Sequence, residues 1–338
     1  MIKIPDYFHH EWHLVALSSS LKQNGVIARK LAGVPIVLFR YAAGVSALQD
    51  RCPHRNYPLS KGRLVEGNLE CPYHGWQFDG NGACKTVPGC TLPKHTKKLG
   101  AQPVHVWEEH GGIFVKLGDE GPEKPPFPAL FGDCSYNHFW WEQGTWQGNC
   151  FDAIENVLDP FHTKFIHHGF IRHRSKSVPV ELLVNSWERS IEMIIRQDRP
   201  DIGLMSRFLE MGGRSESSTR YYPPTMVQAN WQGEQKLTLC VTAFFTPQDE
   251  TSFRPFACFT TPKGYAPAWL KESLIRLFLS PVVRQDREAL AHQHAAAKAF
   301  GAPRYTQGPG DILGSRVHKL YVGKTLEEAS DAPIKAML

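Results

Sequence analysis

Two short segments each offer one thiolate and one imidazole at a fixed spacing, and they constrain the fold more than any other feature of the sequence. The first reads Arg51-Cys52-Pro53-His54-Arg55, and the second reads Cys71-Pro72-Tyr73-His74-Gly75-Trp76. The pattern is Cys-x-His, sixteen intervening residues, then Cys-x-x-His. Cysteine sulfur and histidine nitrogen are donors for zinc and for iron–sulfur centres. We therefore predict that Cys52, His54, Cys71 and His74 bind one metal centre.

The distribution of these donors favours an iron–sulfur cluster over zinc. Structural zinc sites normally take a pair of like ligands from each loop, at spacings unlike these. A 2Fe-2S cluster with two thiolates on one iron and two imidazoles on the other suits two loops that each give one ligand to each iron. The four residues, with the Pro-Tyr-His-Gly-Trp string at 72 to 76, resemble the cluster-binding motif of Rieske proteins. Zinc stays the alternative. A Rieske cluster would make this part of the chain an electron carrier.

Length and composition favour two soluble domains. The 338 residues exceed one domain of usual size and suffice for two cores. The net charge of +5 comes from basic residues scattered along the chain, so nucleic-acid binding is not expected. No apolar run is long enough for a membrane span, and the start lacks the apolar core of a signal peptide, so we expect a cytoplasmic protein. The six cysteines outside the motif show no disulfide spacing, and only Cys84 and Cys90 lie near the predicted cluster.

Hydrophobic periodicity predicts an all-β region at the start of the chain. Strand-like runs occur at 34–39, 45–48 and 69–78, and a hairpin closed by the Gly111-Gly112 pair is expected at 105–116. The two cluster loops should project from such hairpins. Prolines and charges between 118 and 128 suppress helix and sheet alike, so we predict a linker there. The first domain is therefore placed at 1–117.

The remainder, 129–338, is predicted to be a second domain, which makes the whole chain α+β. Strand signals occupy 138–150, 178–196 and 219–262, and helical signals occupy 151–168 and 267–300. The polar stretch Arg207–Arg220 could form a loop over a pocket, but an ordinary solvated loop is the favoured interpretation. Aromatic residues considered for the pocket are also expected core residues: Phe208, Trp231, Phe244 and Phe259.

A second group of metal-binding residue types lies between Glu155 and His168. Asp159, His162 and His167 form the pattern Asp-x-x-His-x-x-x-x-His. A step of five residues would not place both histidines on one face of a straight α-helix, so the helix must be distorted or must end between them. The pattern alone is weak, because histidines in helices are often ordinary hydrogen-bonded residues. Downstream of a Rieske motif, it resembles the catalytic iron site of Rieske non-haem iron oxygenases.

This resemblance implies a mononuclear Fe(II) site with two histidines and one carboxylate as ligands. His162 and His167 would be the imidazole ligands, with His168 as the rival to His167. The family places the carboxylate on a late helix, which selects Asp286 over the other candidates Glu288, Asp249 and Glu272. Because arginines flank Asp286, an ordinary surface ion pair is the alternative for that residue.

The resemblance also implies roles for two polar residues beside the histidines. In the family, the acid that matches Asp159 lies between the catalytic iron and the Rieske histidine of a neighbouring subunit, where its carboxylate can accept a hydrogen bond from each imidazole. The Asp159-Pro160 pair is also a good helix start, so Asp159 could be an N-cap, and both roles could hold. Asn156 would face the iron as a polar group that does not bind it.

By this resemblance, the chain would be the oxygenase component of a multicomponent monooxygenase of the vanillate or dicamba O-demethylase type. Electrons from NAD(P)H would arrive through a separate flavin and iron–sulfur reductase, directly or through a ferredoxin, because no Gly-x-Gly-x-x-Gly fingerprint occurs in the chain. Dioxygen would serve to hydroxylate, or to O- or N-demethylate, a small aromatic or cyclic organic substrate. The alternatives are a cis-dihydroxylating ring dioxygenase and a non-catalytic Rieske electron carrier. A head-to-tail homotrimer is expected.

Overall fold

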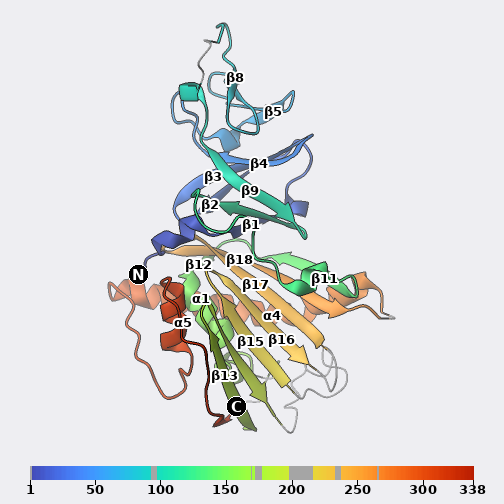
Figure 1. The fold of residues 1–338 in the computed structure, drawn as a ribbon, viewed down its shortest axis with the longest axis vertical. Helices are drawn as coiled ribbons and strands as arrows, with labels where there is room; N and C mark the ends of the chain where they lie inside the picture. The colour runs from blue at the N-terminus through green and yellow to red at the C-terminus, as the bar shows by residue number, and fades with distance from the viewer. Residues whose placement is uncertain are drawn as a thin grey trace. The chain divides into compact units, whose positions relative to one another are not determined.

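The protein is described here from a computed structural model, which covers residues 2–92, 97–168, 170–171, 177–197, 216–232, 237–264 and 266–338. The chain divides into two compact units (Figure 1). One unit comprises Asp6–Phe127 with Thr246–Glu250, and the other comprises Met1–Pro5, Pro128–Phe245 and Thr251–Leu338. Because each unit takes in a short stretch from elsewhere in the chain, the continuous domain limits stated above stay a prediction.

The unit that carries the two Cys/His segments is built on an antiparallel sheet of six strands in the order β1-β10-β9-β4-β3-β2. Their bounds are β1 His13–Leu17, β2 Val26–Leu31, β3 Val34–Tyr41, β4 Gly44–Gln49, β9 Pro103–Glu109 and β10 Gly112–Lys116. Residues of β3 alternate between two cores, because successive side chains of a strand point to opposite faces. Ile36 and Leu38 join one cluster of buried residues, and Val37 and Phe39 join another that also contains Cys52 and Cys71. Cys52 and Cys71 therefore belong to the core that packs on the Val37 and Phe39 face of this sheet.

The predicted β9–β10 hairpin is present, but its turn lies one residue earlier than expected. Glu109 pairs with Gly112, so His110 and Gly111 form the turn. Both have positive φ, 50° and 82°, as a tight two-residue hairpin turn requires. Placing the turn at Gly111-Gly112 was wrong because the sequence does not show that His110 accepts the left-handed conformation.

A smaller antiparallel sheet supports the second Cys/His segment. It consists of β5 Arg63–Val65, β6 Asn68–Glu70, β7 Gln77–Phe78 and β8 Cys84–Thr86, in that order. The run predicted at 69–78 is therefore two strands with the Cys71 segment looping out between them. The Cys52 segment differs from the prediction, because it follows β4 of the large sheet and precedes β5 of the small one and does not close a hairpin. Short 3-10 helices occur at Asp6–His10, before β1, and between strands at Ser18–Ser20, Leu59–Lys61, Lys97–Leu99 and Ala129–Gly132.

A buried histidine in this unit predicts acid sensitivity. His13 is 1% exposed, its Nε2 lies 2.9 Å from the carbonyl oxygen of Phe8, and its Nδ1 has no partner among the described residues. Burial lowers the pKa of His13 from 6.5 to about 4. Between these two pKa values, His13 is protonated in the unfolded chain and neutral in the folded chain. The free energy of unfolding is therefore highest above pH 6.5 and decreases as the pH falls toward 4. From pH 7 to pH 5 the loss should be about 2 kcal/mol.

The measurement is the thermal midpoint of the wild type and of His13→Gln at both pH values. Glutamine can still donate to Phe8, but it does not titrate. The wild type should lose several degrees more than the variant between pH 7 and pH 5. Equal losses would show that His13 is not the responsible group.

The other unit is built on an antiparallel sheet of ten strands in the order β11-β18-β17-β16-β15-β14-β13-β19, with β12 paired to β18 and β20 to β13. Their bounds are β11 Tyr136–Glu142, β12 Trp146–Gln147, β13 Pro179–Trp187, β14 Ser190–Arg196, β15 Glu216–Tyr222, β16 Met226–Gln232, β17 Leu237–Asp249, β18 Ser252–Pro262, β19 Ala329–Ser330 and β20 Ile334–Met337. The expected antiparallel strands and the α+β class are confirmed. The short strands β19 and β20 were not predicted.

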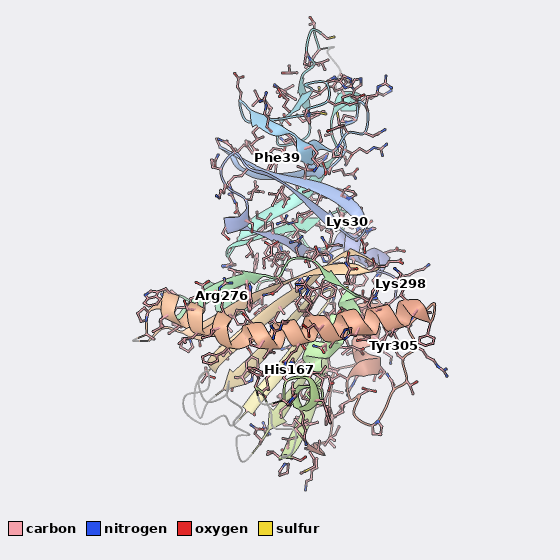
Figure 2. All side chains as sticks on the ribbon, turned by 180° about the vertical axis from the view of Figure 1, so that it is seen from behind. Lys30, Phe39, His167, Arg276, Lys298 and Tyr305 are labelled. Atoms are coloured by element: carbon pink, nitrogen blue, oxygen red, sulfur yellow. The ribbon has the colours of Figure 1, made fainter. Side chains whose placement is uncertain are left out.

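Four α-helices are described in this unit: α1 Cys150–Leu158, α2 Thr163–Ile166, α4 Ala268–Ala299 and α5 Gly314–Tyr321. The long helix α4 lies across the sheet between the labelled Arg276 and Lys298 (Figure 2). Ile275 and Leu279 anchor it against Phe139, Leu239 and Phe259 of the strands. No helix in the described ranges is long and apolar enough to cross a membrane.

The aromatic pocket candidates belong to the core where the structure describes them. Phe259 is part of the α4 contact, and Trp231 packs against the same cluster. Phe244 is buried and stacks on Trp140 with ring centroids 6.1 Å apart. Phe208 and most of the stretch Arg207–Arg220 lie outside the described residues.

Candidate metal centres

The two Cys/His segments fold into loops with the same backbone hydrogen bonds. In the first, the Cys52 N–H donates to the carbonyl of Tyr57 and the Asn56 N–H donates to the carbonyl of Cys52. In the second, Cys71 N–H donates to Trp76 and Gly75 N–H donates to Cys71. The fifth residue of each loop has positive φ, 61° at Asn56 and 71° at Gly75. Asparagine and glycine are the residues that tolerate this conformation best, so local sequence explains the paired loops.

The loops bring the four predicted cluster ligands together, with both cysteines buried, His54 half-buried and His74 exposed. Cys52 and Cys71 are 2% and 1% exposed. The His54 and His74 rings have centroids 4.6 Å apart, and Trp76 stacks on His54 at 4.7 Å with the planes 5° apart. This arrangement suits a 2Fe-2S cluster in which two thiolates bind one iron and two imidazoles bind the other.

Two features show that these residues fit a metal cluster. The Nδ1 atom of His54 is buried and has no hydrogen-bond partner among the described residues, which is unusual unless the lone pair is used otherwise. Burial raises the pKa of the Cys52 thiol to about 11, an effect opposed by the N–H of His54 and reinforced by the neighbouring Cys71. Two buried sulfurs are unfavourable as free thiolates, and a bound metal stabilises them in that form.

In the other unit, the helical conformation is interrupted between α1 and α2, within the predicted iron-binding sequence. The Asp159 carboxylate accepts hydrogen bonds from the backbone N–H groups of Phe161 and His162, at 2.7 and 3.2 Å. The short helix α2 then follows, with His162 directly before it and His167 directly after it. Because α2 ends between His162 and His167, the two histidines do not have to share a face of one straight helix. This is the second of the two possibilities that their five-residue spacing allowed. Asp159 is the C-cap of α1 and its carboxylate stabilises the turn that follows, but the N-cap of α2 is His162, so the helix start predicted at Asp159-Pro160 was wrong.

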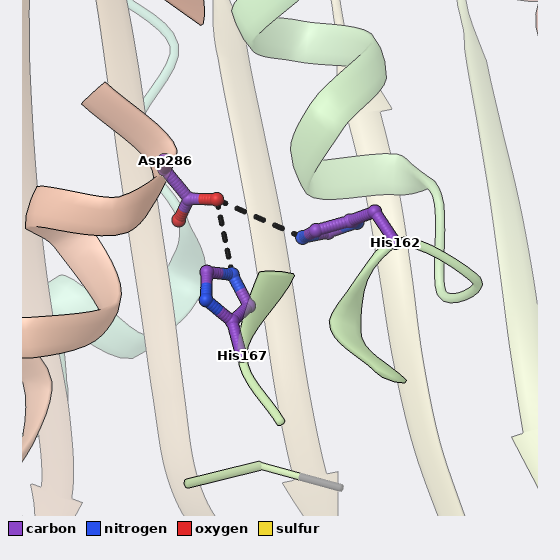
Figure 3. A group of neighbouring side chains, drawn as sticks. All are labelled: His162, His167 and Asp286. Carbon is purple, nitrogen blue, oxygen red and sulfur yellow. Dashed lines mark ion pairs between the residues drawn. The ribbon is translucent and has the colours of Figure 1, made fainter. Parts of the chain in front are cut away.

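His162, His167 and Asp286 converge on one point (Figure 3). Their candidate ligand atoms all lie within 4.8 Å of one another. Asp286 Oδ1 is 3.0 Å from His167 Nε2 and 3.7 Å from His162 Nε2. Asp286 comes from α4, whereas both histidines flank α2. Two imidazoles and one carboxylate are the donor set of non-haem iron(II) sites.

Hydrogen bonds on the far side of each ring leave Nε2 available. His162 Nδ1 lies 2.7 Å from the backbone oxygen of Asp159, and His167 Nδ1 lies 2.9 Å from Gln285 Oε1. Both acceptors require Nδ1 to carry a proton, so in each ring Nε2 is the nitrogen that faces Asp286. Burial lowers the pKa of His162 despite the opposing carboxylates. Burial also acts to lower the pKa of His167, but hydrogen bonds to Asp286 and Gln285 raise it overall.

Of the other predicted residues, Asn156 contacts the triad and the rival ligands lie away from it. Asn156 Nδ2 donates to Asp286 Oδ1 at 3.0 Å, so it holds the carboxylate. The Asp159 side chain is 44% exposed, and its Oδ2 is 3.8 Å from His162 Nδ1. The predicted hydrogen bond from this imidazole therefore goes to the backbone oxygen of Asp159 and not to its carboxylate. Asp286 contacts histidines, although arginines flank it in the sequence. The rival residues lie elsewhere: Glu288 is exposed, Asp249 pairs with Lys30, Glu272 pairs with Arg276, and His168 is exposed with Nδ1 3.3 Å from the Phe165 oxygen. Gln285 was missed, since only the fold brings it to His167.

A cavity of about 520 Å³ opens beside α1 and the turn that follows it. Asn156 and Asp159 line it together with Tyr305 and Asp311, but none of the three convergent residues does. Burial, with the carboxylates of Asp152, Asp311 and Asp159, raises the pKa of Glu155 in its wall to about 7. The cavity is therefore lined by acidic residues next to Asp159 and is not lined by the triad.

Comparison with known protein families matches both units. The model of the Rieske [2Fe-2S] domain matches residues 11–97, and the model of the vanillate O-demethylase oxygenase C-terminal domain matches residues 146–321. The second match covers more than half of the chain.

Several curated proteins are similar to the chain in sequence. The 4beta-methylsterol monooxygenase of Methylococcus capsulatus is 27% identical over 82% of this chain and 78% of its own length. The methylxanthine N1-demethylase NdmA of Pseudomonas putida is 31% identical over 52% of this chain and 51% of its own length. Protein TIC 55 of Arabidopsis thaliana is 29% identical over 70% of this chain but only 43% of its own length.

Solved structures share the fold. Dicamba monooxygenase bound to dicamba superposes with a TM-score of 0.78 at 23% identity, over 93% of this chain and 96% of that chain. NdmA with caffeine superposes with a TM-score of 0.77 at 22% identity, over 93% of this chain and 90% of that one. The succession of a β-rich unit and a sheet-rich unit with few helices is common to all three.

Proposed function

Because the chain belongs to the Rieske oxygenase family defined by the vanillate O-demethylase oxygenase C-terminal domain, we propose that it is the oxygenase component of a multicomponent monooxygenase. Its substrate would be a small cyclic organic molecule, which it hydroxylates or O- or N-demethylates. The reaction takes up one dioxygen, two electrons and two protons, places one oxygen atom in a carbon–hydrogen bond and releases the other as water. In a demethylation, the hydroxylated methyl group leaves as formaldehyde.

One observation carries this proposal: the convergence of His162, His167 and Asp286 with both Nε2 atoms directed at the carboxylate. A Rieske electron carrier needs only the cluster and has no use for a second site with free positions. The same chain also has the Cys/His loops, so an electron source and an oxygen-activating site occur together.

In this proposal, each group of residues has a distinct part. Cys52 and Cys71 would bind one iron of the 2Fe-2S cluster, and His54 and His74 would bind the other. His162, His167 and Asp286 would hold the mononuclear iron, which supplies dioxygen activation when bound. Asn156 fixes the Asp286 carboxylate through its 3.0 Å hydrogen bond. The backbone oxygen of Asp159 holds the proton on His162 Nδ1 and keeps that ring turned toward the site.

The names of the relatives support the substrate class and the partner. They include a methylsterol monooxygenase, methylxanthine demethylases and the oxygenase component of a 3-ketosteroid-9-alpha-monooxygenase. The term oxygenase component implies a separate reductase, and we propose a flavin and iron–sulfur reductase that uses NAD(P)H, acting directly or through a ferredoxin. We place this reaction in the cytoplasm. None of these names describes cis-dihydroxylation.

The assembly we propose is a head-to-tail homotrimer, in which the cluster of one chain serves the iron of the next through Asp159. The carboxylate of Asp159 is partly exposed beside the acidic cavity, while Tyr73, Arg51 and Arg55 are exposed on the cluster loops. A basic and aromatic loop tip complements an acidic hollow. A cyclic interface of this kind repeats the same pairing at every junction.

The test of the function is a substrate screen with a surrogate reductase. The purified chain would be supplied with NADH, the reductase and panels of methoxylated aromatics, N-methylated heterocycles and sterols. We expect coupled consumption of NADH and dioxygen with formaldehyde or a hydroxylated product. A vicinal cis-diol as the product would instead support dihydroxylation. A chain that takes up about two irons, with no third, and activates no oxygen would be an electron carrier.

The cluster itself gives a separate prediction. The purified chain should be red-brown and, once reduced, should give a Rieske-type electron paramagnetic resonance signal, because imidazole ligation makes the two irons inequivalent. His54→Cys should change that signal without necessarily removing the cluster, since sulfur can still bind iron. A colourless protein that holds zinc after anaerobic, iron-replete expression would exclude the Rieske assignment.

A further inference from the structure

We propose that Gln285 is a positioning residue for the iron site. Its side-chain carbonyl holds the His167 imidazole in the tautomer and the orientation that leave Nε2 for the metal. The inference rests on the proposed function, because it assigns a part to a residue around the same site. Gln285 lies on α4 directly before Asp286, and its Oε1 is 2.9 Å from His167 Nδ1.

Consecutive residues of one helix contact both nitrogens of a single ring. Gln285 reaches Nδ1 at 2.9 Å, and Asp286 reaches Nε2 at 3.0 Å. The two ring nitrogens are separated by one carbon, so these contacts fix the ring plane as well as its position. His167 is 1% exposed, and water cannot replace the glutamine at Nδ1 without opening the site. Helix α4 thus supplies one proposed ligand and orients another.

The two imidazoles differ in the kind of group that accepts the Nδ1 proton. His162 Nδ1 donates to the backbone oxygen of Asp159, which no substitution of a side chain removes. At His167 the corresponding acceptor is a side chain, so it can be changed while the ligand stays. An amide oxygen accepts the proton without adding charge. A carboxylate in that place would make the imidazole a stronger donor to the metal.

The experiment measures metal affinity in the chain with its cluster intact. The mononuclear iron is removed by a chelator, and cobalt(II) is titrated back against a competing chelator while its visible absorption is followed. Gln285→Met keeps the length and packing of the side chain but removes the acceptor, and it should weaken cobalt binding about ten- to a hundredfold. Gln285→Glu should bind cobalt at least as tightly as the wild type. Arg284→Met, at the exposed neighbouring position, should bind cobalt like the wild type.

A second readout separates positioning from packing. In the cobalt form, the Nδ1 proton of each bound imidazole gives a paramagnetically shifted, exchangeable proton resonance. One of the two resonances should exchange faster or disappear in Gln285→Met and persist in Gln285→Glu. Wild-type affinity together with both resonances in Gln285→Met would overturn the inference.

Two further outcomes are decisive. If Gln285→Met fails to retain its cluster spectrum, Gln285→Glu decides alone, since it keeps the shape and the acceptor. A tenfold loss of affinity in Gln285→Glu would then overturn the inference. If the unmodified chain takes up no cobalt, the proposed function fails and this inference with it.

Discussion

Asp286→Ala should lose the mononuclear metal and product formation while it keeps the cluster spectrum. The carboxylate is the point on which both imidazoles converge, 3.0 Å from His167 and 3.7 Å from His162. Loss of a hydrogen bond behind a metal ligand typically costs ten- to a hundredfold, so loss of the ligand itself should reduce product formation more than about a hundredfold. The iron content should fall from about three to about two per chain.

Glu288→Ala is the matched control for this experiment. Glu288 lies on the same helix and is exposed, so its removal should leave iron content and activity close to those of the wild type. The Asp286 variant should also keep its reduced electron paramagnetic resonance signal, because the cluster loops belong to the other unit. Full activity in Asp286→Ala, with activity lost in Glu288→Ala, would show that the carboxylate ligand was assigned to the wrong residue.

The cluster loops could be predicted from the sequence because every feature they need is local. Cysteine and histidine stand a few residues apart, and the residues with positive φ, Asn56 and Gly75, lie within the same loops. The iron site was harder, because Asp286 lies far along the chain from both histidines. Without the family resemblance, nothing in the sequence separated it from Glu272 and Glu288, which lie on the same helix.

What the sequence did not show depends on the tertiary structure. Gln285 reads as one polar residue among several on α4, and its contact with His167 spans 118 residues. The short strands β19 and β20 contain little alternation, and they exist because the edge of β13 offers hydrogen bonds to them. In the same way, Thr246–Glu250 joins the cluster-bearing unit although its strand β17 belongs to the other sheet. Local patterns do not encode such long-range pairings.

Two inactive variants of the chain should restore activity when they assemble together. Cys52→Ser lacks a working cluster, and His162→Ala lacks a working iron site, so neither parent should turn over. In a head-to-tail trimer, every mixed ring contains one junction where an intact cluster faces an intact iron site. Purified mixed trimers should therefore recover about a third of the wild-type activity, because one junction of three is complete. If electrons stayed within one chain, mixed rings would remain inactive, since no chain has both centres.

Asp159→Asn tests the route across that junction when it is placed in the Cys52→Ser chain, which keeps its iron. Asparagine keeps one acceptor oxygen for the shorter of the two bonds, the one from the Phe161 N–H at 2.7 Å, so the turn before α2 should survive. It cannot supply a second carboxylate oxygen to an imidazole of the neighbouring chain, so the recovery should be suppressed while both metals stay bound. Recovery that is unaffected by Asp159→Asn would remove Asp159 from the route. Inactive mixed trimers, with subunit exchange and metal content verified, would refute transfer between chains.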